Sequence, residues 1–261
     1  MRTDWNRARF KETGKTTFLA NYWPFVGVVV LNLILSDSGI FTQINQRAND
    51  LLQYFVAFEI SPVPGWLVSL EAHTRLMPSL SIGATFVIAL LLAYPYEVGM
   101  CRFLLEHSAG QQAPFSRVGF GFQSNYGNVV LTQFLRALFT FLWTLLFIIP
   151  GIVRSIGYFA VPYILAENPH LPWRQVLQLS LHMTDGYKGR IFVFTLSYLG
   201  WFILDGLTLG ILGVFYVNPY YYAAQTEVYR HLRECALAEG IATPVDLPGL
   251  PPPIPPERSL P

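Results

Sequence analysis

The feature that most limits the fold of this chain is an apolar stretch that runs from residue 129 to residue 166. Arg136 and Arg154 are the only charged residues in it, and Pro150-Gly151 divides it into two parts. An α-helix needs about 20 apolar residues to cross a hydrocarbon core about 30 Å thick. The first part, residues 129–149, is long enough to cross, and residues 150–166 form a shorter, tilted crossing or a re-entrant segment.

The composition supports a membrane environment for the whole chain. Hydrophobic residues make up 52% of the sequence and charged residues only 13%, whereas charged residues approach a quarter of a soluble domain. The sequence predicts an all-α fold: a polytopic membrane helical bundle of about six transmembrane helices with amphipathic helices at the interface. The expected crossings are residues 18–36, 79–100, 129–149, 150–166, 191–208 and 211–231.

The basic residues predict the orientation of these crossings. With six crossings, the side that holds both termini receives thirteen of the seventeen basic residues, and the opposite side receives only Arg47, Arg75 and Arg154. The bias weakens if residues 150–166 do not cross. Because basic residues concentrate in cytoplasmic loops, we expect a multi-pass protein of the cell inner (plasma) membrane with both termini cytoplasmic.

The expected six-helix membrane domain, residues 18–236, follows a basic juxtamembrane segment, residues 1–17. Within the domain, residues 37–78 form an extracytoplasmic loop and residues 101–128 a polar connector between spans. The end of the chain, residues 237–261, is rich in proline and is expected to be a disordered tail.

Four of the charged residues within or near the apolar segments are the intramembrane polar candidates: Glu97, Arg136, Arg154 and Asp205. A charge alone in lipid costs at least about 2.5 kcal/mol on insertion scales. The sequence therefore leaves two interpretations open: an ion pair between Glu97 and Arg136, or an Arg136 that snorkels to the near headgroups while Glu97 sits in the interface.

Two sites are expected to break helices at membrane depth. Pro150-Gly151 ends the third crossing, and Asn218-Pro219 loosens the sixth. Broken helices expose backbone dipoles, which can bind ions or anionic groups.

From the central stretch onward, the chain resembles the bacterial integral membrane family catalogued as domain of unknown function 975. The residues that carry the resemblance are Ile149-Pro150-Gly151-Ile152, Tyr158, Tyr163-Ile164-Leu165-Ala166-Glu167-Asn168-Pro169, Ser180, Met183, Gly186, Lys188, Gly200-Trp201, Leu207-Thr208-Leu209-Gly210, Pro219-Tyr220 and Tyr229. Residues 1–128 match mainly by hydropathy. The resemblance implies a membrane protein and, because the family has no settled activity, implies no chemistry.

Three functions are weighed on this basis. No protease, esterase, β-lactamase or dithiol motif occurs, so the first is a non-enzymatic scaffold or envelope-maintenance protein that organises lipids or membrane-protein partners, including copies of itself. The second is a small-solute or ion transporter or channel that uses the four charged candidates and the two helix breaks. The third, an enzyme or metal site built on His170, His182 and Asp185, is the least expected. No catalytic residue, metal site, cofactor or nucleic-acid partner is expected.

Overall fold

The computed structural model describes residues 5–36 and 89–250, and all regular structure within them is helical. Several expectations concern residues outside this range. They are the extracytoplasmic loop at 37–78, the start of the second crossing at 79–88, and the end of the proline-rich tail at 251–261.

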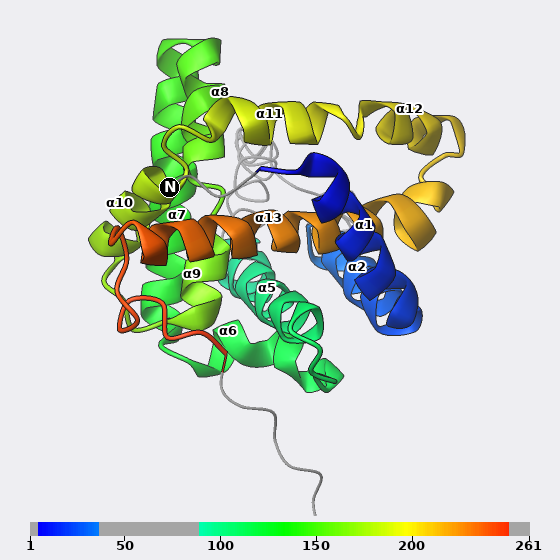
Figure 1. Cartoon of the computed structure of the whole chain (residues 1–261), viewed down its shortest axis with the longest axis horizontal. Helices are drawn as coiled ribbons and strands as arrows, with labels where there is room; N and C mark the ends of the chain where they lie inside the picture. Colours follow the sequence, from blue (N-terminus) through cyan, green and yellow to red (C-terminus); the bar gives the residue numbers. More distant parts are fainter. Residues whose placement is uncertain (1–4, 37–88, 251–261) are drawn as a thin grey trace, which may run out of the picture. The chain divides into compact units, whose positions relative to one another are not determined.

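Fourteen helical elements follow one another in the described residues (Figure 1). In chain order they are α1 (Arg7–Ala20), α2 (Tyr22–Ser36), the π-helical turn η2 (Ala89–Ala93), α5 (Tyr94–Ser108), the 3₁₀ turn η3 (Phe115–Gly119), α6 (Phe120–Gln123), α7 (Tyr126–Leu146), α8 (Ile148–Gly157), α9 (Val161–Glu167), α10 (Trp173–Met183), α11 (Lys188–Leu196), α12 (Leu199–Leu207), the π-helical turn η4 (Gly213–Val217) and α13 (Asn218–Ala238).

The chain divides into two compact units, Met1–Val30 with Tyr94–Pro261, and Leu31–Ala93. In the first unit, α5, α9 and α13 form the buried centre. All seven residues of α9 are buried, as are twelve residues each of α5 and α13. Helix α1 packs closely on α13, because a Cβ at Gly14 would lie 2.7 Å from the Ala224 backbone. Glycine at this position therefore lets the two helix backbones approach.

The most apolar helices surround this centre and remain largely exposed. Three helical segments are long and apolar enough to cross a membrane: Tyr126–Leu146, Ile148–Glu167 and Lys188–Leu207. In the first and third, only 17% of the apolar window is buried. Leu145, Ile149 and Leu209 are 74%, 76% and 92% exposed. Apolar side chains exposed over whole helices are covered by lipid in membrane proteins, so the described part of the chain is that of a membrane-associated helical protein.

Helices α7 and α8 form an antiparallel hairpin, and Figure 1 shows α11 and α12 running across its direction. The three segments that can cross therefore do not all run parallel to one another. Helix α13, the expected sixth crossing, is not among these segments. It continues to Ala238 and carries Glu227 near its middle and Arg230 and Arg233 in its second half.

The first expected crossing, residues 18–36, is interrupted. Helix α1 ends at Ala20, and α2 leaves it at an angle of 98°. Pro24 has no N–H group with which to bond the carbonyl group of Ala20. In addition, the Asn21 side-chain amide donates to the Thr17 carbonyl oxygen at 3.1 Å. A side chain that competes for helical carbonyl groups favours a helix end. As a bent pair, α1 and α2 could form one further crossing.

The expected connector at 101–128 and the expected disordered tail were wrong in part. Residues 101–108 continue α5 as a buried helix. The beginning of the tail, residues 243–249, packs against the ends of α9 and α13, and Leu247 is only 1% exposed. The Asn168 side-chain amide donates to the carbonyl oxygens of Val245 and Asp246, so side-chain hydrogen bonds to its backbone hold a proline-rich segment that has no helix of its own.

Candidate functional site

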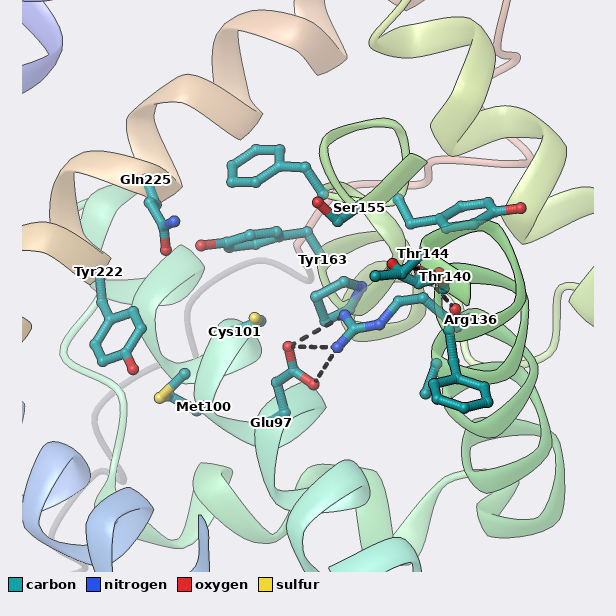
Figure 2. A pocket seen from close by; sticks show the side chains of 15 residues that line it. Glu97, Met100, Cys101, Arg136, Thr140, Thr144, Ser155, Tyr163, Tyr222 and Gln225 are labelled. Carbon is teal, nitrogen blue, oxygen red and sulfur yellow. Dashed lines mark hydrogen bonds and ion pairs between the residues drawn. The ribbon is translucent and has the colours of Figure 1, made fainter. Parts of the chain in front are cut away.

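Glu97 in the first turn of α5 and Arg136 on α7 form an ion pair. The Arg136 Nη1 and Nη2 atoms donate to Glu97 Oε1 at 3.2 Å, and Nη2 also donates to Oε2 at 3.0 Å. Figure 2 shows the two side chains pointing toward one another from their helices. This is one of the two arrangements that the sequence left open, and the two charges are not separate.

Arg136 lies nearer the middle of its helix than the sequence suggested. Because α7 begins at Tyr126 and ends at Leu146, Arg136 is ten residues from each end, or about 15 Å by helical rise. The sequence had placed it about seven residues inside the crossing. A guanidinium group at this depth needs a partner, and Glu97 supplies a carboxylate whose second oxygen also accepts from Gln133 Nε2 at 3.0 Å.

The ion pair borders a cavity of about 520 Å³ between α5, α7, α8, α9 and α13. The residues that line it are Glu97, Met100, Cys101, Arg136, Ala137, Thr140, Phe141, Thr144, Ser155, Tyr158, Phe159, Pro162, Tyr163, Tyr222 and Gln225. The side chains of Arg136 and Glu97 are 23% and 29% exposed. Both charged groups are therefore paired with each other and still open to the cavity.

Polar and aromatic groups share the cavity wall. The hydroxyl groups of Thr140 and Thr144 donate to the carbonyl oxygens of Arg136 and Thr140, one helical turn earlier, both at 2.8 Å. Their lone pairs remain available to a ligand, because a hydroxyl group that donates one hydrogen bond can still accept. Tyr163 and Gln225 lie on the wall opposite Arg136 in Figure 2. The cavity can thus bind a polar molecule that has a charged end and an apolar body.

Arg154 and Asp205, the other two charged candidates, do not line this cavity. The Arg154 guanidinium lies over the Trp143 ring, 5.0 Å from its centroid, on the neighbouring leg of the hairpin. The Asp205 carboxylate accepts from the Gly213 N–H at 2.6 Å and ties α12 to η4. Each of them is satisfied locally, by a cation–π contact or by a backbone donor.

Pro150 and Gly151 do not form the expected helix break. The break is at Phe147, whose backbone is extended, and both residues lie in the first turns of α8. Proline is tolerated there because the first N–H groups of a helix have no intrahelical partner. Gly151 is a packing residue instead, since a Cβ on it would lie 2.7 Å from the Thr144 Cα. At Asn218-Pro219, the helix changes from the π-helical turn η4 to α13 without ending.

A second buried polar group was missed by sequence reasoning. Glu167, at the end of α9, accepts from the Tyr229 hydroxyl group at 2.9 Å, from Arg233 Nε at 2.9 Å and from the Gly249 N–H at 3.0 Å. A further buried ion pair lies within α5, where Arg102 and Glu106 are 2.7 Å apart. The sequence could have indicated this pair, because residues four apart lie on one face of a helix.

Chemistry based on a bound metal has no support in the described residues. Within residues 5–36 and 89–250, no group of three or more His, Cys, Asp or Glu side chains could hold a metal ion. His170, His182 and Asp185, the residues of the least expected hypothesis, therefore do not form such a group.

The described residues thus belong to a helical, membrane-associated protein with a polar cavity beside an apolar hairpin. A family model described as protein of unknown function (DUF975) matches residues 86–236. This is more than half of the chain, and the chain belongs to that family. The matched region contains every residue of the cavity. No curated protein and no solved structure matches the chain.

Proposed function

We propose that this protein binds a small zwitterionic solute at the Glu97–Arg136 pair and carries it across the membrane. The observation behind the proposal is the position of the pair: Arg136 lies at the middle of the apolar helix α7, and both side chains line a cavity of about 520 Å³. Cavities of roughly 300–1,000 Å³ are typical of small-molecule sites, and charged side chains at membrane depth mark solute pathways by default.

The chemistry of the pair indicates the class of solute. A zwitterion has an anionic and a cationic group, so its carboxylate can bind Arg136 while its ammonium group binds Glu97. Each protein charge then exchanges one ionic partner for another without being left alone in lipid, which would cost at least about 2.5 kcal/mol. Aromatic rings such as Tyr158 and Tyr163 line the rest of the cavity and suit an apolar or quaternary ammonium group.

The proposal includes the topology expected from the sequence. The protein crosses the cell inner membrane six times with both termini cytoplasmic, acts without a cofactor and catalyses no covalent chemistry. The basic residues of the chain support this orientation, as cytoplasmic loops are enriched in lysine and arginine. The scaffold role stays a prediction of the sequence, and no described contact favours it over solute binding.

Binding can be tested with a panel of amino acids and betaines added to the purified protein in a neutral detergent. A zwitterion that binds the folded state raises its free energy of unfolding by about 2.7 kcal/mol at one hundred times its Kd. E97Q and R136Q should remove this stabilisation. The exposed pair formed by Asp185 and Lys188, 3.3 Å apart on the protein surface, offers D185N and K188Q as controls that should keep it.

Transport is then measured as uptake of the radiolabelled zwitterion into proteoliposomes. We expect uptake by the unaltered protein and by both control variants, and none by E97Q or R136Q. If no zwitterion stabilises the protein and none is taken up, solute transport is wrong. Membrane proteins that co-purify at fixed stoichiometry would then support the scaffold role.

A further inference from the structure

A basic cleft lies between the start of α1 and the start of α11, on a different part of the unit from the Glu97–Arg136 cavity. It has a volume of about 640 Å³ and is lined by Trp5, Arg7, Gly186, Gly189, Arg190 and Val193. A neighbouring hollow of about 490 Å³ shares Trp5 and Arg7 and adds Lys11. Two arginines from different helices thus face one space, with a lysine beside them.

These cations have no carboxylate partner within the described residues. The ion pairs found there do not include Arg7, Lys11 or Arg190. The nearby Asp185 pairs with Lys188 at 3.3 Å. Arg7 and Lys11 are four residues apart on α1, a spacing at which like charges repel. Arg190 lies over the Tyr187 ring, 5.5 Å from its centroid, and this contact leaves its donors free for an anion.

The shape of the cleft is fixed by an aromatic cluster. The Trp5 ring packs against Phe10 at 5.1 Å, against Tyr187 at 5.6 Å and against His231 at 5.6 Å between centroids. These contacts hold the beginning of α1 against α11 and α13, and so set the position of Arg7. A Cβ added to Gly189 would meet no atom within 4 Å, so this side of the cleft is open.

The cleft also lies at one end of a segment that can cross a membrane. That segment is Lys188–Leu207, and Gly186, Gly189 and Arg190 are at its beginning. Residues at the end of a crossing are at headgroup level, where tryptophan and basic side chains concentrate. Basic pockets between membrane helices on the cytoplasmic side suit the phosphate groups of anionic lipids.

We propose that Arg7 and Arg190, with Lys11 beside them, bind the phosphate group of an anionic phospholipid in the cleft. Each guanidinium group can donate two hydrogen bonds to phosphate oxygens. The acyl chains would extend along the exposed apolar surface of α11, where Phe192, Val193 and Leu196 are 46%, 42% and 50% exposed. This lipid site does not depend on solute binding at the Glu97–Arg136 pair.

The test is native mass spectrometry of the full chain, released from neutral detergent micelles with added phosphatidylglycerol or phosphatidylcholine. We expect one phosphatidylglycerol to bind in preference to phosphatidylcholine. In R7Q/R190Q, its affinity should fall about 25-fold, because each basic residue near an anionic lipid contributes about a factor of five. The matched control is R174Q, which removes an exposed arginine on α10, outside the cleft, and should bind as the unaltered chain does.

Three outcomes would overturn the proposal. Equal binding of the two lipids would show that the cleft does not recognise the anionic headgroup. An equal loss of affinity in R174Q and R7Q/R190Q would show a general charge effect. Displacement of the lipid by inorganic phosphate or glycerol 3-phosphate at similar concentrations would assign the cleft to a free phosphate compound. Circular dichroism of each variant establishes that it is folded before its affinity is compared.

Discussion

Removing both charges of the Glu97–Arg136 pair should destabilise the protein by less than the sum of the two single removals. At 3.0 Å, two unit charges attract by about 5 kcal/mol at an effective dielectric constant of 20, and desolvation offsets part of this attraction. We expect E97Q and R136Q each to lower the free energy of unfolding by about 3 kcal/mol, since each leaves one charge unpaired. The double variant should lose less than the sum of the singles, which gives a coupling energy of about 2 kcal/mol.

The assay is equilibrium unfolding of the four proteins in mixed micelles. The same cycle on Asp185 and Lys188, an exposed pair at 3.3 Å, is the control and should give no more than about 0.5 kcal/mol. The charge swap E97R/R136E should also be more stable than either single reversal. A coupling energy below about 0.5 kcal/mol at Glu97 and Arg136, within the error of additivity, would show that the two charges do not depend on each other.

Three further predictions concern packing, the chain end and pH. G99A should lower the free energy of unfolding by about 1–3 kcal/mol, because the added Cβ would lie 1.8 Å from a backbone carbonyl oxygen of η3. Thermal unfolding measures this loss. In the control G200A, on α12, the added Cβ would meet no atom within 4 Å, and stability should be unchanged or slightly higher. E167A should release residues 243–249, seen as faster amide exchange there, since Glu167 accepts from Gly249 and Arg233; unchanged exchange would refute this anchoring role. Burial lowers the pKa of His107 below its ordinary value of 6.5. As the pH drops below about 6.5, the unfolded chain therefore takes up a proton at this residue before the folded chain does, and the free energy of unfolding should fall. In H107Q this part of the pH dependence of stability should disappear.

The sequence predicted the features that follow from the cost of leaving groups unsatisfied in lipid. The helical class follows because backbone groups in lipid must bond within a segment. The same cost, applied to charges, made an ion pair between Glu97 and Arg136 one of the two arrangements that the sequence left open. The choice between them depended on how α5 and α7 pack.

Features that depend on packing could not be predicted in this way. Pro150-Gly151 resembles a helix break, yet Gly151 serves to let α8 approach Thr144. Arg102 and Glu106 resemble surface charges of a connector, yet they satisfy each other, and Arg102 also donates to the Ala166 carbonyl oxygen at 2.8 Å. A local pattern cannot distinguish these alternatives, because a residue on another element decides between them.

The cavity itself was only partly visible in the sequence. Glu97 and Arg136 were found through their charge, whereas Thr140 and Thr144 are ordinary residues for an apolar helix. Thr140 and Thr144 follow Arg136 by four and eight residues, which places them on its face of α7; this spacing is the signal that could have found them. Tyr163 and Gln225 come from α9 and α13, and their position depends entirely on how these helices pack.

The proposed function depends most directly on whether the α7–α8 hairpin crosses the membrane. The measurement is labelling of single cysteines in intact cells with an impermeant thiol reagent, in a chain whose buried Cys101 and Cys235 are replaced by alanine. The hairpin tip is probed at Phe147, which is 66% exposed, because Gly151 has no room for a side chain. Exposed His170 and Thr208 probe the ends of the following crossings. Six crossings predict external labelling at positions 147 and 208 and none at position 170. External labelling at position 170 would show that residues 150–166 do not cross, and no labelling at position 147 from either side would place the hairpin tip within the bilayer. Either result would contradict a hairpin that crosses the membrane and a transport path along it.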